Sequence, residues 1–235
     1  MTIQKTISPV DGSVYCEREL ATDAAIDTAL TQAREAQQRW RLTPVAERAR
    51  VCLSFCGNFE AETREIATEL TWQMGRPIRY APNEVRGTLE RARHMIAIAG
   101  DALADIDVGP KDGFQRFLRR EPLGIVFTIA AWNYPYLIAV NSVIPALMAG
   151  NAVLLKHSAQ TPLCAERFEN CLRAAGLPDG LFRVLQLSHE QTSRLIRDPR
   201  VDFVAFTGSV DGGRAVQRAA AERFIGVGLE LGGCD

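Results

Sequence analysis

Residues 124–135 read GIVFTIAAWNYP, an apolar run that closes in a turn containing Asn133. Largely apolar runs follow at residues 152–155, 182–185 and 203–206, and a last one ends at Leu231. Strands that are apolar along their whole length are typical of parallel sheets, because helices cover both sheet faces. We therefore predict a Rossmann-like, doubly wound α/β fold from residue 123 onward.

Helical patterns fill the intervals between these runs and most of the chain before them. The predicted helices cover residues 22–38, 44–72, 82–100, 138–148, 162–175, 189–197 and 213–222. The first three rest on amphipathic periodicity and on prolines at first-turn positions. A short strand or hairpin is expected around Gly12. The N-terminal segment is thus predicted to be mainly helical.

A turn cluster separates the helical part from the sheet. Residues 109–113 read GPKDG, and residues 114–120 after them alternate between polar and apolar side chains. Such alternation is typical of an exposed strand. We predict a protruding β-ribbon over residues 106–122.

Charge and hydropathy narrow the class of protein. The chain has 235 residues, a net charge of −1 and 47% hydrophobic residues. Its basic residues are scattered singly, so we expect no nucleic-acid or anionic-membrane partner. The longest apolar stretch, residues 123–131, is shorter than the roughly 20 residues that span a bilayer. The N-terminus has no signal-peptide pattern, and we expect a cytoplasmic protein.

The six cysteines are too few for a disulfide scaffold of this size and lack CxxC spacing. Cys52 and Cys56 lie four residues apart on an expected helix, a spacing that could bring two metal ligands together. No His or carboxylate pair completes a set. We therefore expect buried core thiols and no metal site.

Four short motifs stand where the apolar runs end. Parallel sheets bind ligands at the carboxyl ends of their strands, so these motifs are the place to look for function. They are AWNYP at 131–135, KHS at 156–158, FTGS at 206–209 and ELGG at 230–233.

In this order and spacing the four motifs resemble those of the aldehyde dehydrogenase superfamily, whose usual forms are PWNFP, KPSE, FTGS and ELGG. The similarity spans nearly the whole chain and includes residues 40–41, 44–48, 145–151, 161–162 and 175–180. It implies NAD(P)-dependent oxidation of an aldehyde to a carboxylic acid. It also divides the chain into a helical part of the cofactor-binding domain (1–105), a ribbon expected to serve oligomerisation (106–122) and a dinucleotide-binding part (123–235), and the full-length protein would be a homo-oligomer.

Two residues receive catalytic roles from this resemblance. Asn133 offers a neutral amide donor, which suits stabilisation of an oxyanion. Glu230 would be the base for deacylation, and burial after an apolar run would suit a carboxylate to that task. Taken without the resemblance, Asn133 is more typical of a turn and Glu230 of a paired surface glutamate.

The resemblance also implies a cofactor, NAD or NADP, and the residues that hold it. Lys156 corresponds to a position that binds the adenosine ribose, and its burial would favour an oxygen-rich ligand. Ala159 replaces a glutamate that holds the ribose hydroxyls in many NAD-preferring members, which makes NADP admissible. His157 replaces the usual proline and is expected to act as a spacer.

The pyrophosphate is expected at Gly208 and Ser209, before a helix that begins near Asp211, because helix N-termini favour anions. Residues 185–189 depart from the glycine-rich turn that is frequent in the family, which leaves contacts there open. The remaining predicted cofactor-binding residues are Ile129, Ala131, Trp132, Ser158, Thr207, Gly212, Leu231 and Gly232.

The nucleophile of the family is a cysteine roughly thirty residues beyond ELGG, in a second, catalytic domain. We expect this chain to end before both, and Cys234 to serve local packing only. Three hypotheses follow: part of an active dehydrogenase, a form that only binds nucleotide, and an interaction module that uses the ribbon. The motifs favour the first, and the aldehyde itself cannot be read from them.

Overall fold

The computed structural model describes residues 2–233. Its central sheet has five parallel strands in the order β7-β6-β5-β8-β9. Val153 pairs in parallel register with Val126 and Phe182, and Val204 with Phe127 and Val227. The parallel, doubly wound sheet predicted from the apolar runs is confirmed. The strands are β5 (Ile125–Ala130), β6 (Ala152–His157), β7 (Phe182–Val184), β8 (Phe203–Gly208) and β9 (Gly226–Leu231).

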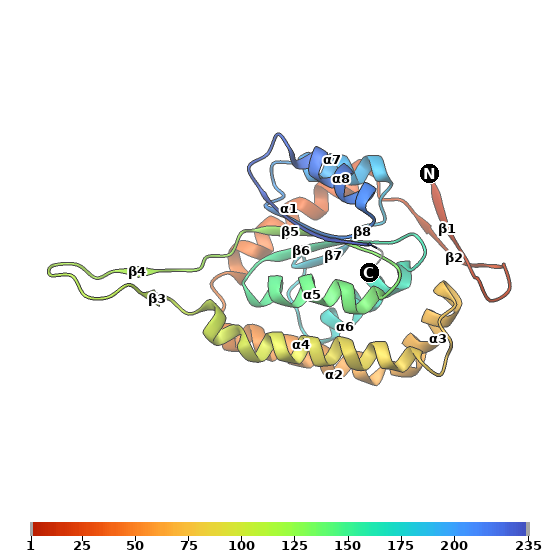
Figure 1. The fold of residues 1–235 in the computed structure, drawn as a ribbon, viewed down its shortest axis with the longest axis horizontal. Helices are drawn as coiled ribbons and strands as arrows, with labels where there is room; N and C mark the ends of the chain where they lie inside the picture. The colour runs from red at the N-terminus through yellow and green to blue at the C-terminus, as the bar shows by residue number, and fades with distance from the viewer. Residues whose placement is uncertain (1, 234–235) are drawn as a thin grey trace.

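Helices cover both faces of the sheet (Figure 1). On one face lie α5 (Pro135–Met148) and α6 (Pro162–Ala174). On the other lie α7 (His189–Arg197), α8 (Val210–Ala220) and, from the start of the chain, α1 (Asp23–Trp40). Helix α5 begins three residues earlier than predicted, and α8 begins at Val210, next to the start expected near Asp211. Pro135 is the first residue of α5, and Ser209 caps α8 by accepting a hydrogen bond from the Gly212 N–H.

A further helical layer packs outside α5 and α6. It contains α2 (Val45–Ala61), α3 (Thr63–Met74) and α4 (Ala81–Leu103). The single helix predicted over residues 44–72 is wrong, because the chain leaves helical geometry at Glu62. The Glu62 carboxylate accepts a hydrogen bond from Arg167 on α6 at 2.5 Å, a long-range contact that local periodicity does not reveal. Cys52 and Cys56 are buried in this layer, as expected of core thiols.

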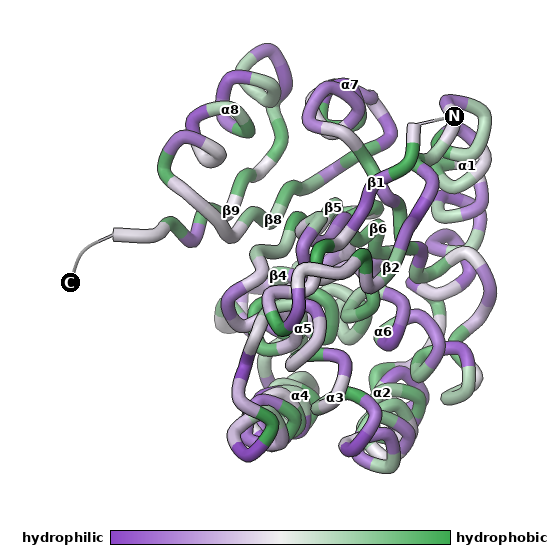
Figure 2. The backbone as a smooth tube through the Cα atoms, turned by 90° about the vertical axis from the view of Figure 1, so that its right-hand side faces the viewer, coloured by the Kyte–Doolittle hydropathy of each residue, from purple (hydrophilic) through white to green (hydrophobic). Residues whose placement is uncertain are grey.

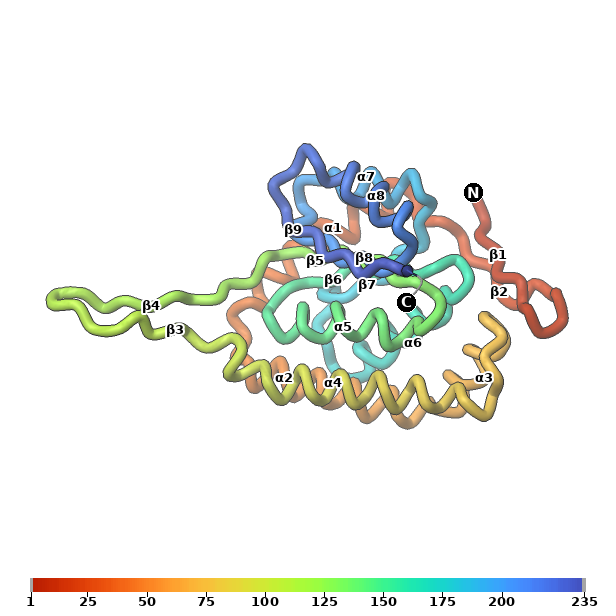
Figure 3. Tube along the Cα trace, viewed as in Figure 1, coloured from red at the N-terminus to blue at the C-terminus, as the bar shows by residue number. Residues whose placement is uncertain are grey.

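Two hairpins project from the body (Figures 1 and 3). The N-terminal one pairs β1 (Ile3–Ile7) with β2 (Val14–Glu19), around the turn expected at Gly12. The other is the predicted ribbon, where β3 (Ile106–Asp107) pairs with β4 (Phe117–Leu118). The strand expected over residues 114–120 is reduced to these two paired residues. At the base of the ribbon, Glu121 forms an ion pair of 3.0 Å with Arg41, whereas Phe114 and Leu118 further out are exposed.

The core runs from the sheet into the outer helices. Figure 2 shows the central strands mainly in hydrophobic colours, whereas the surrounding helices alternate between hydrophobic and hydrophilic. Tyr136, at the start of α5, is fully buried among Phe59 and Phe168, with ring centroids 5.0 and 5.8 Å away. This aromatic packing anchors the helix that follows Asn133. Among residues 2–233, no helix combines the length and apolarity that a bilayer crossing requires.

Candidate active site

The carboxyl ends of β5, β6, β8 and β9 open into one cleft of about 1030 Å³. The cleft lies where the strand order reverses, between β5 and β8, which is the position at which open α/β sheets bind ligands. Thirteen of the fourteen predicted site residues line it, and they come from all four motifs. They are Ile129, Ala131, Trp132, Asn133, Lys156, Ser158, Ala159, Thr207, Gly208, Ser209, Glu230, Leu231 and Gly232.

Asn133 lies in the turn between β5 and α5. Its main-chain carbonyl accepts a hydrogen bond from Nη2 of Arg76 at 2.6 Å. Its side chain is exposed in the cleft lining and has no hydrogen-bond partner within residues 2–233. The main chain is therefore held while the amide is free to donate to a ligand. The neighbouring Trp132 is 52% exposed and gives the cleft an apolar wall.

Lys156 stands at the end of β6, in register with Ile129 of β5. Its side chain is half-buried, and burial lowers the pKa of the ammonium below its ordinary value. No carboxylate within residues 2–233 forms an ion pair with it. A desolvated cation without a partner favours an anionic or oxygen-rich ligand. The ribose and phosphates of a dinucleotide have that chemistry, so the residues present fit such a cofactor.

The charges of the side chains that line the cleft also fit a dinucleotide cofactor. Glu230 is the one acidic side chain among the described residues that line the cleft. Ala159 is exposed there and contributes no charge, while its main-chain carbonyl accepts a hydrogen bond from Thr6 Oγ1 at 2.8 Å. The β1–β2 hairpin thus fixes the loop after β6. A phosphate near Lys156 and Ala159 would meet no opposing carboxylate from this loop.

His157 does more than separate its neighbours. It is buried, and its Nε2 lies 3.1 Å from the main-chain oxygen of Pro135. Its Nδ1 accepts a hydrogen bond from the Ser158 N–H at 3.0 Å and lies 3.0 Å from Thr161 Oγ1. Burial lowers the pKa of His157 to about 4. The expected spacer role is wrong, because the ring ties the end of β6 to the start of α5.

The turn before α8 is built around an aromatic ring. A Cβ atom added at Gly208 or Gly212 would lie 2.6 Å from Cζ of Phe206, so the two glycines leave room for that side chain. Gly212 does not line the cleft, and its cofactor contact stays a prediction. Ser209 lies at the helix N-terminus and in the cleft lining, where a pyrophosphate would be favoured.

Glu230 lines the cleft but is exposed, contrary to the burial expected from the apolar run before it. The reason is its place on β9, which is an edge strand with a neighbour on the β8 side only. Within residues 2–233 the carboxylate has no salt-bridge partner. It therefore faces the cleft as an accessible acceptor.

Several residues that line the cleft were not predicted from the sequence. The hairpin contributes Gln4 and, at its two ends, Thr2 and Leu20. Leu187, Ser188 and His189 come from the segment where contacts had been left open. Ser188 and Gln191 form a capping box at the start of α7, a pattern that the sequence does carry. The hairpin carries no such signal, because its approach depends on long-range packing.

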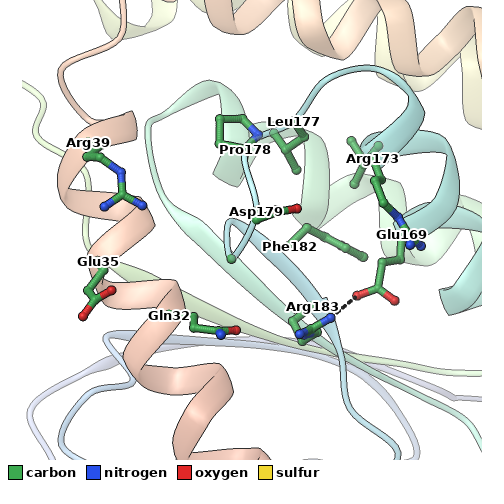
Figure 4. Close-up of a pocket in the computed structure, with 12 residues that line it drawn as sticks. Gln32, Glu35, Arg39, Glu169, Arg173, Leu177, Pro178, Asp179, Phe182 and Arg183 are labelled. Atoms are coloured by element: carbon green, nitrogen blue, oxygen red, sulfur yellow. Dashed lines mark ion pairs between the residues drawn. The ribbon is translucent and has the colours of Figure 1, made fainter.

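A second cavity, of about 450 Å³, lies between α1, α6 and β7, away from the motifs (Figure 4). Arg39, Arg173 and Arg183 line it together with Glu35, Glu169 and Asp179. An ion pair of 3.8 Å joins Arg183 to Glu169. The charges balance, and none of the predicted site residues reaches this cavity.

Residues 2–233 contain neither a cluster of metal ligands nor a cysteine in the cleft. No group of three His, Cys, Asp or Glu side chains there could hold a metal ion. No described cysteine lines the cleft, and Cys164 and Cys171 are buried in α6. Cys234 lies outside the described residues.

The whole chain is similar to known proteins. It is 34% identical over 233 residues to a protein of Mycobacterium avium (strain 104) named succinate-semialdehyde dehydrogenase [NADP(+)], with 98% of this chain and 49% of the relative covered. It is 35% identical over 228 residues to 3,6-anhydro-alpha-L-galactose dehydrogenase of Streptomyces coelicolor, covering 97% of this chain and 46% of that protein. The chain thus spans about half the length of these curated relatives.

Solved structures show the same likeness. Succinic semialdehyde dehydrogenase from Streptococcus pyogenes, solved with NADP+ as the cofactor, superposes with a TM-score of 0.93 at 27% identity. That superposition covers 99% of this chain and 51% of the other. The aldehyde dehydrogenase family matches residues 2–235. This chain therefore belongs to the aldehyde dehydrogenase family.

Proposed function

We propose that this chain is the cofactor-binding portion of an NAD(P)-dependent aldehyde dehydrogenase, which oxidises an aldehyde to a carboxylic acid. One observation carries the proposal. Four motifs that are far apart in sequence meet in one cleft at the switch point of the sheet, around the unpartnered Lys156. The same cleft is lined by Asn133 and Glu230, so the cofactor-binding and catalytic candidates share one site.

Each cleft residue has a distinct task in this proposal. Asn133 donates its side-chain N–H to the substrate oxygen as negative charge develops there. Glu230 accepts a proton from the water that releases the acid. The attacking thiolate comes from outside the described residues, since no described cysteine reaches the cleft. When bound, the nicotinamide ring accepts the hydride.

Lys156, Ser158 and Ala159 bind the adenosine ribose in this proposal, and Ser209 with the α8 N-terminus binds the pyrophosphate. A 2′-phosphate is tolerated because Ala159 adds no carboxylate beside Lys156. The names of the relatives agree: the Mycobacterium avium protein is named for NADP, and the Streptococcus pyogenes structure was solved with it. We propose that the chain accepts NADP at least as well as NAD.

The ribbon is proposed as an oligomerisation element. It extends away from the body, and its large apolar side chains, Ile106, Phe114, Phe117 and Leu118, are exposed. Exposed apolar residues on an isolated two-stranded ribbon favour a protein partner, and strand edges favour pairing with another strand. A second subunit is the partner that we propose.

Titration calorimetry of the purified chain with NADP and with NAD tests the core of this proposal. We expect saturable binding of one dinucleotide per chain. Absence of binding at millimolar cofactor by a chain whose circular dichroism shows it folded would contradict the proposed function. The substitution Asn133→Ala in a complete two-domain enzyme distinguishes the two hypotheses. Loss of turnover is expected if the chain is a portion of a dehydrogenase, and no such loss is expected if the chain only binds nucleotide.

A further inference from the structure

Two side chains outside the cleft, those of Arg76 and Glu84, form hydrogen bonds with the main chain around Asn133. Arg76 lies in the turn before α4, and its Nη2 donates to the Asn133 carbonyl at 2.6 Å. Its guanidinium also stacks over the Tyr134 ring, 4.6 Å from the centroid. The other terminal nitrogen, Nη1, pairs with Oε2 of Glu84 on α4. Arg76 is thus fixed from both sides, with its side chain only 13% exposed.

Glu84 connects Arg76 to the first turn of α5. Its Oε1 accepts hydrogen bonds from the main-chain N–H groups of Tyr136 at 2.9 Å and Leu137 at 3.5 Å. These groups belong to the first turn of α5, where N–H donors have no acceptor within the helix. The carboxylate also complements the positive end of that helix. One buried carboxylate therefore serves both the arginine and the helix start.

The Arg76–Glu84 pair lies largely in the protein interior. The Glu84 side chain is fully buried, and its burial raises the pKa of the carboxyl, while Arg76 and the two N–H groups act in the opposite direction. A buried charge without its partner is strongly destabilising, so the two residues depend on each other.

We infer that Arg76 and Glu84 are positioning residues that set the direction in which the Asn133 amide points into the cleft. The inference rests on the proposed function of Asn133. The Asn133 side chain has no hydrogen-bond partner of its own within residues 2–233, so the described chain constrains it only through its main chain, which sets the direction of the Cα–Cβ bond. The pair holds that main chain on both sides, at the Asn133 carbonyl and at the Tyr136 N–H. Donor placement within about half an ångström decides how well an oxyanion site works.

Nuclear magnetic resonance on the 235-residue chain tests this inference. The readouts are the Asn133 side-chain amide resonance, assigned with Asn133→Asp, and hydrogen exchange at the Tyr136 and Leu137 amides. The variants are Arg76→Met, Arg76→Lys and Glu84→Gln. Arg79→Met is the matched control, because Arg79 stacks on Tyr80 at the same 4.6 Å but makes no contact with Asn133. NADP affinity reports on the integrity of the cleft.

We expect Arg76→Met to shift the Asn133 amide resonance, because the Asn133 carbonyl loses the hydrogen bond from Nη2. Exchange at Tyr136 should change less, because its N–H keeps the Glu84 carboxylate as acceptor. Arg76→Lys keeps the ion pair but loses the forked geometry, and an intermediate shift is expected. Glu84→Gln still accepts from Tyr136 but no longer pairs with Arg76, so the resonance should move more than the exchange rate. NADP affinity should stay within about threefold, as expected for a folded cleft.

Two results would overturn the inference: an unchanged Asn133 resonance in all three variants, or the same shift in Arg79→Met. If Arg76→Met does not fold, Arg76→Lys and Glu84→Gln still decide the question. Failure of the wild-type chain to bind NADP would contradict the proposed function instead. The resonance and exchange data do not require the cofactor, so the two failures can be told apart.

Discussion

The imidazole of His157 and the carbonyl oxygen of Pro135 lie 3.1 Å apart, joining the strand that carries Lys156 to the helix that follows Asn133. The Nδ1 atom on the other side of the ring accepts the Ser158 N–H. The ring must therefore carry its proton on Nε2 and remain neutral. This buried contact links the part of the cleft that is proposed to bind the cofactor to the part that contains Asn133.

This contact predicts a pH-dependent stability. Burial lowers the pKa of His157 from 6.5 to about 4, so between these values the unfolded chain binds more protons than the folded one. Stability is then complete above pH 6.5 and falls as the pH drops toward 4. The free energy of unfolding should fall by about 2 kcal/mol from pH 7 to pH 5 on this account.

The measurement is urea unfolding of the wild type and of His157→Gln at several pH values. Glutamine can donate to Pro135 and does not titrate, so the variant should lack this part of the pH dependence. Subtracting the two curves removes the contributions of other groups, including Glu84, whose raised pKa acts with the opposite sign. Parallel curves would contradict the assignment of a neutral buried imidazole.

Cofactor choice follows from the loop after β6. Ala159→Glu would place a carboxylate beside Lys156, and we expect NADP affinity to fall about tenfold while NAD affinity is preserved. Ala159→Gln is the control for size. Titration of both cofactors against the three proteins measures the effect. Equal losses for NAD and NADP would show that Ala159 does not face the ribose.

Lys156→Met removes the half-buried cation but keeps most of the side-chain volume. Both dinucleotides should bind about tenfold to a hundredfold more weakly, because a charge-assisted hydrogen bond contributes roughly 1.5–3 kcal/mol. Stability should be unchanged or higher, since the desolvated ammonium has no ion-pair partner within residues 2–233. Unaltered cofactor affinity would place the ribose elsewhere. The melting temperature measured in the same samples checks the second expectation.

The sheet could be predicted because its strands are apolar along their whole length. Residues 125–130 are all buried, and that burial has a direct signature in the sequence. The break at Glu62 could not be predicted, because it depends on a long-range partner, whereas the start of α5 has a local signal in Pro135 and a long-range one in Glu84. Glu62 is held by Arg167, and the start of α5 is held by Glu84.

Some features of the candidate site could likewise be predicted from the sequence, and others could not. Its motifs were found because each stands at the end of a strand, and the fold brings such ends together. The exposure of Glu230 was missed because an apolar run looks the same in a central strand and at an edge such as β9. Arg76 and Glu84 were missed because neither belongs to a motif. Their role depends on the packing of α4 against α5.

The chain alone should not oxidise aldehydes above background with NAD or NADP, because no described cysteine reaches the cleft. A steady-state assay of the purified chain at high protein concentration suffices. The remaining cysteine, Cys234, lies outside the described residues and is examined by Cys234→Ala. Robust turnover that this substitution abolishes would show that the packing role expected for Cys234 is wrong.

Hydrogen exchange of the 235-residue chain with and without saturating NADP shows where the dinucleotide binds. We expect protection at Trp132 and Asn133, at Lys156 to Ala159, and at the Ser209 end of α8. The segments around Arg39 and Arg183, which line the other cavity, should exchange at unchanged rates. Protection confined to that cavity, with the ends of β5, β6 and β8 unchanged, would contradict the account.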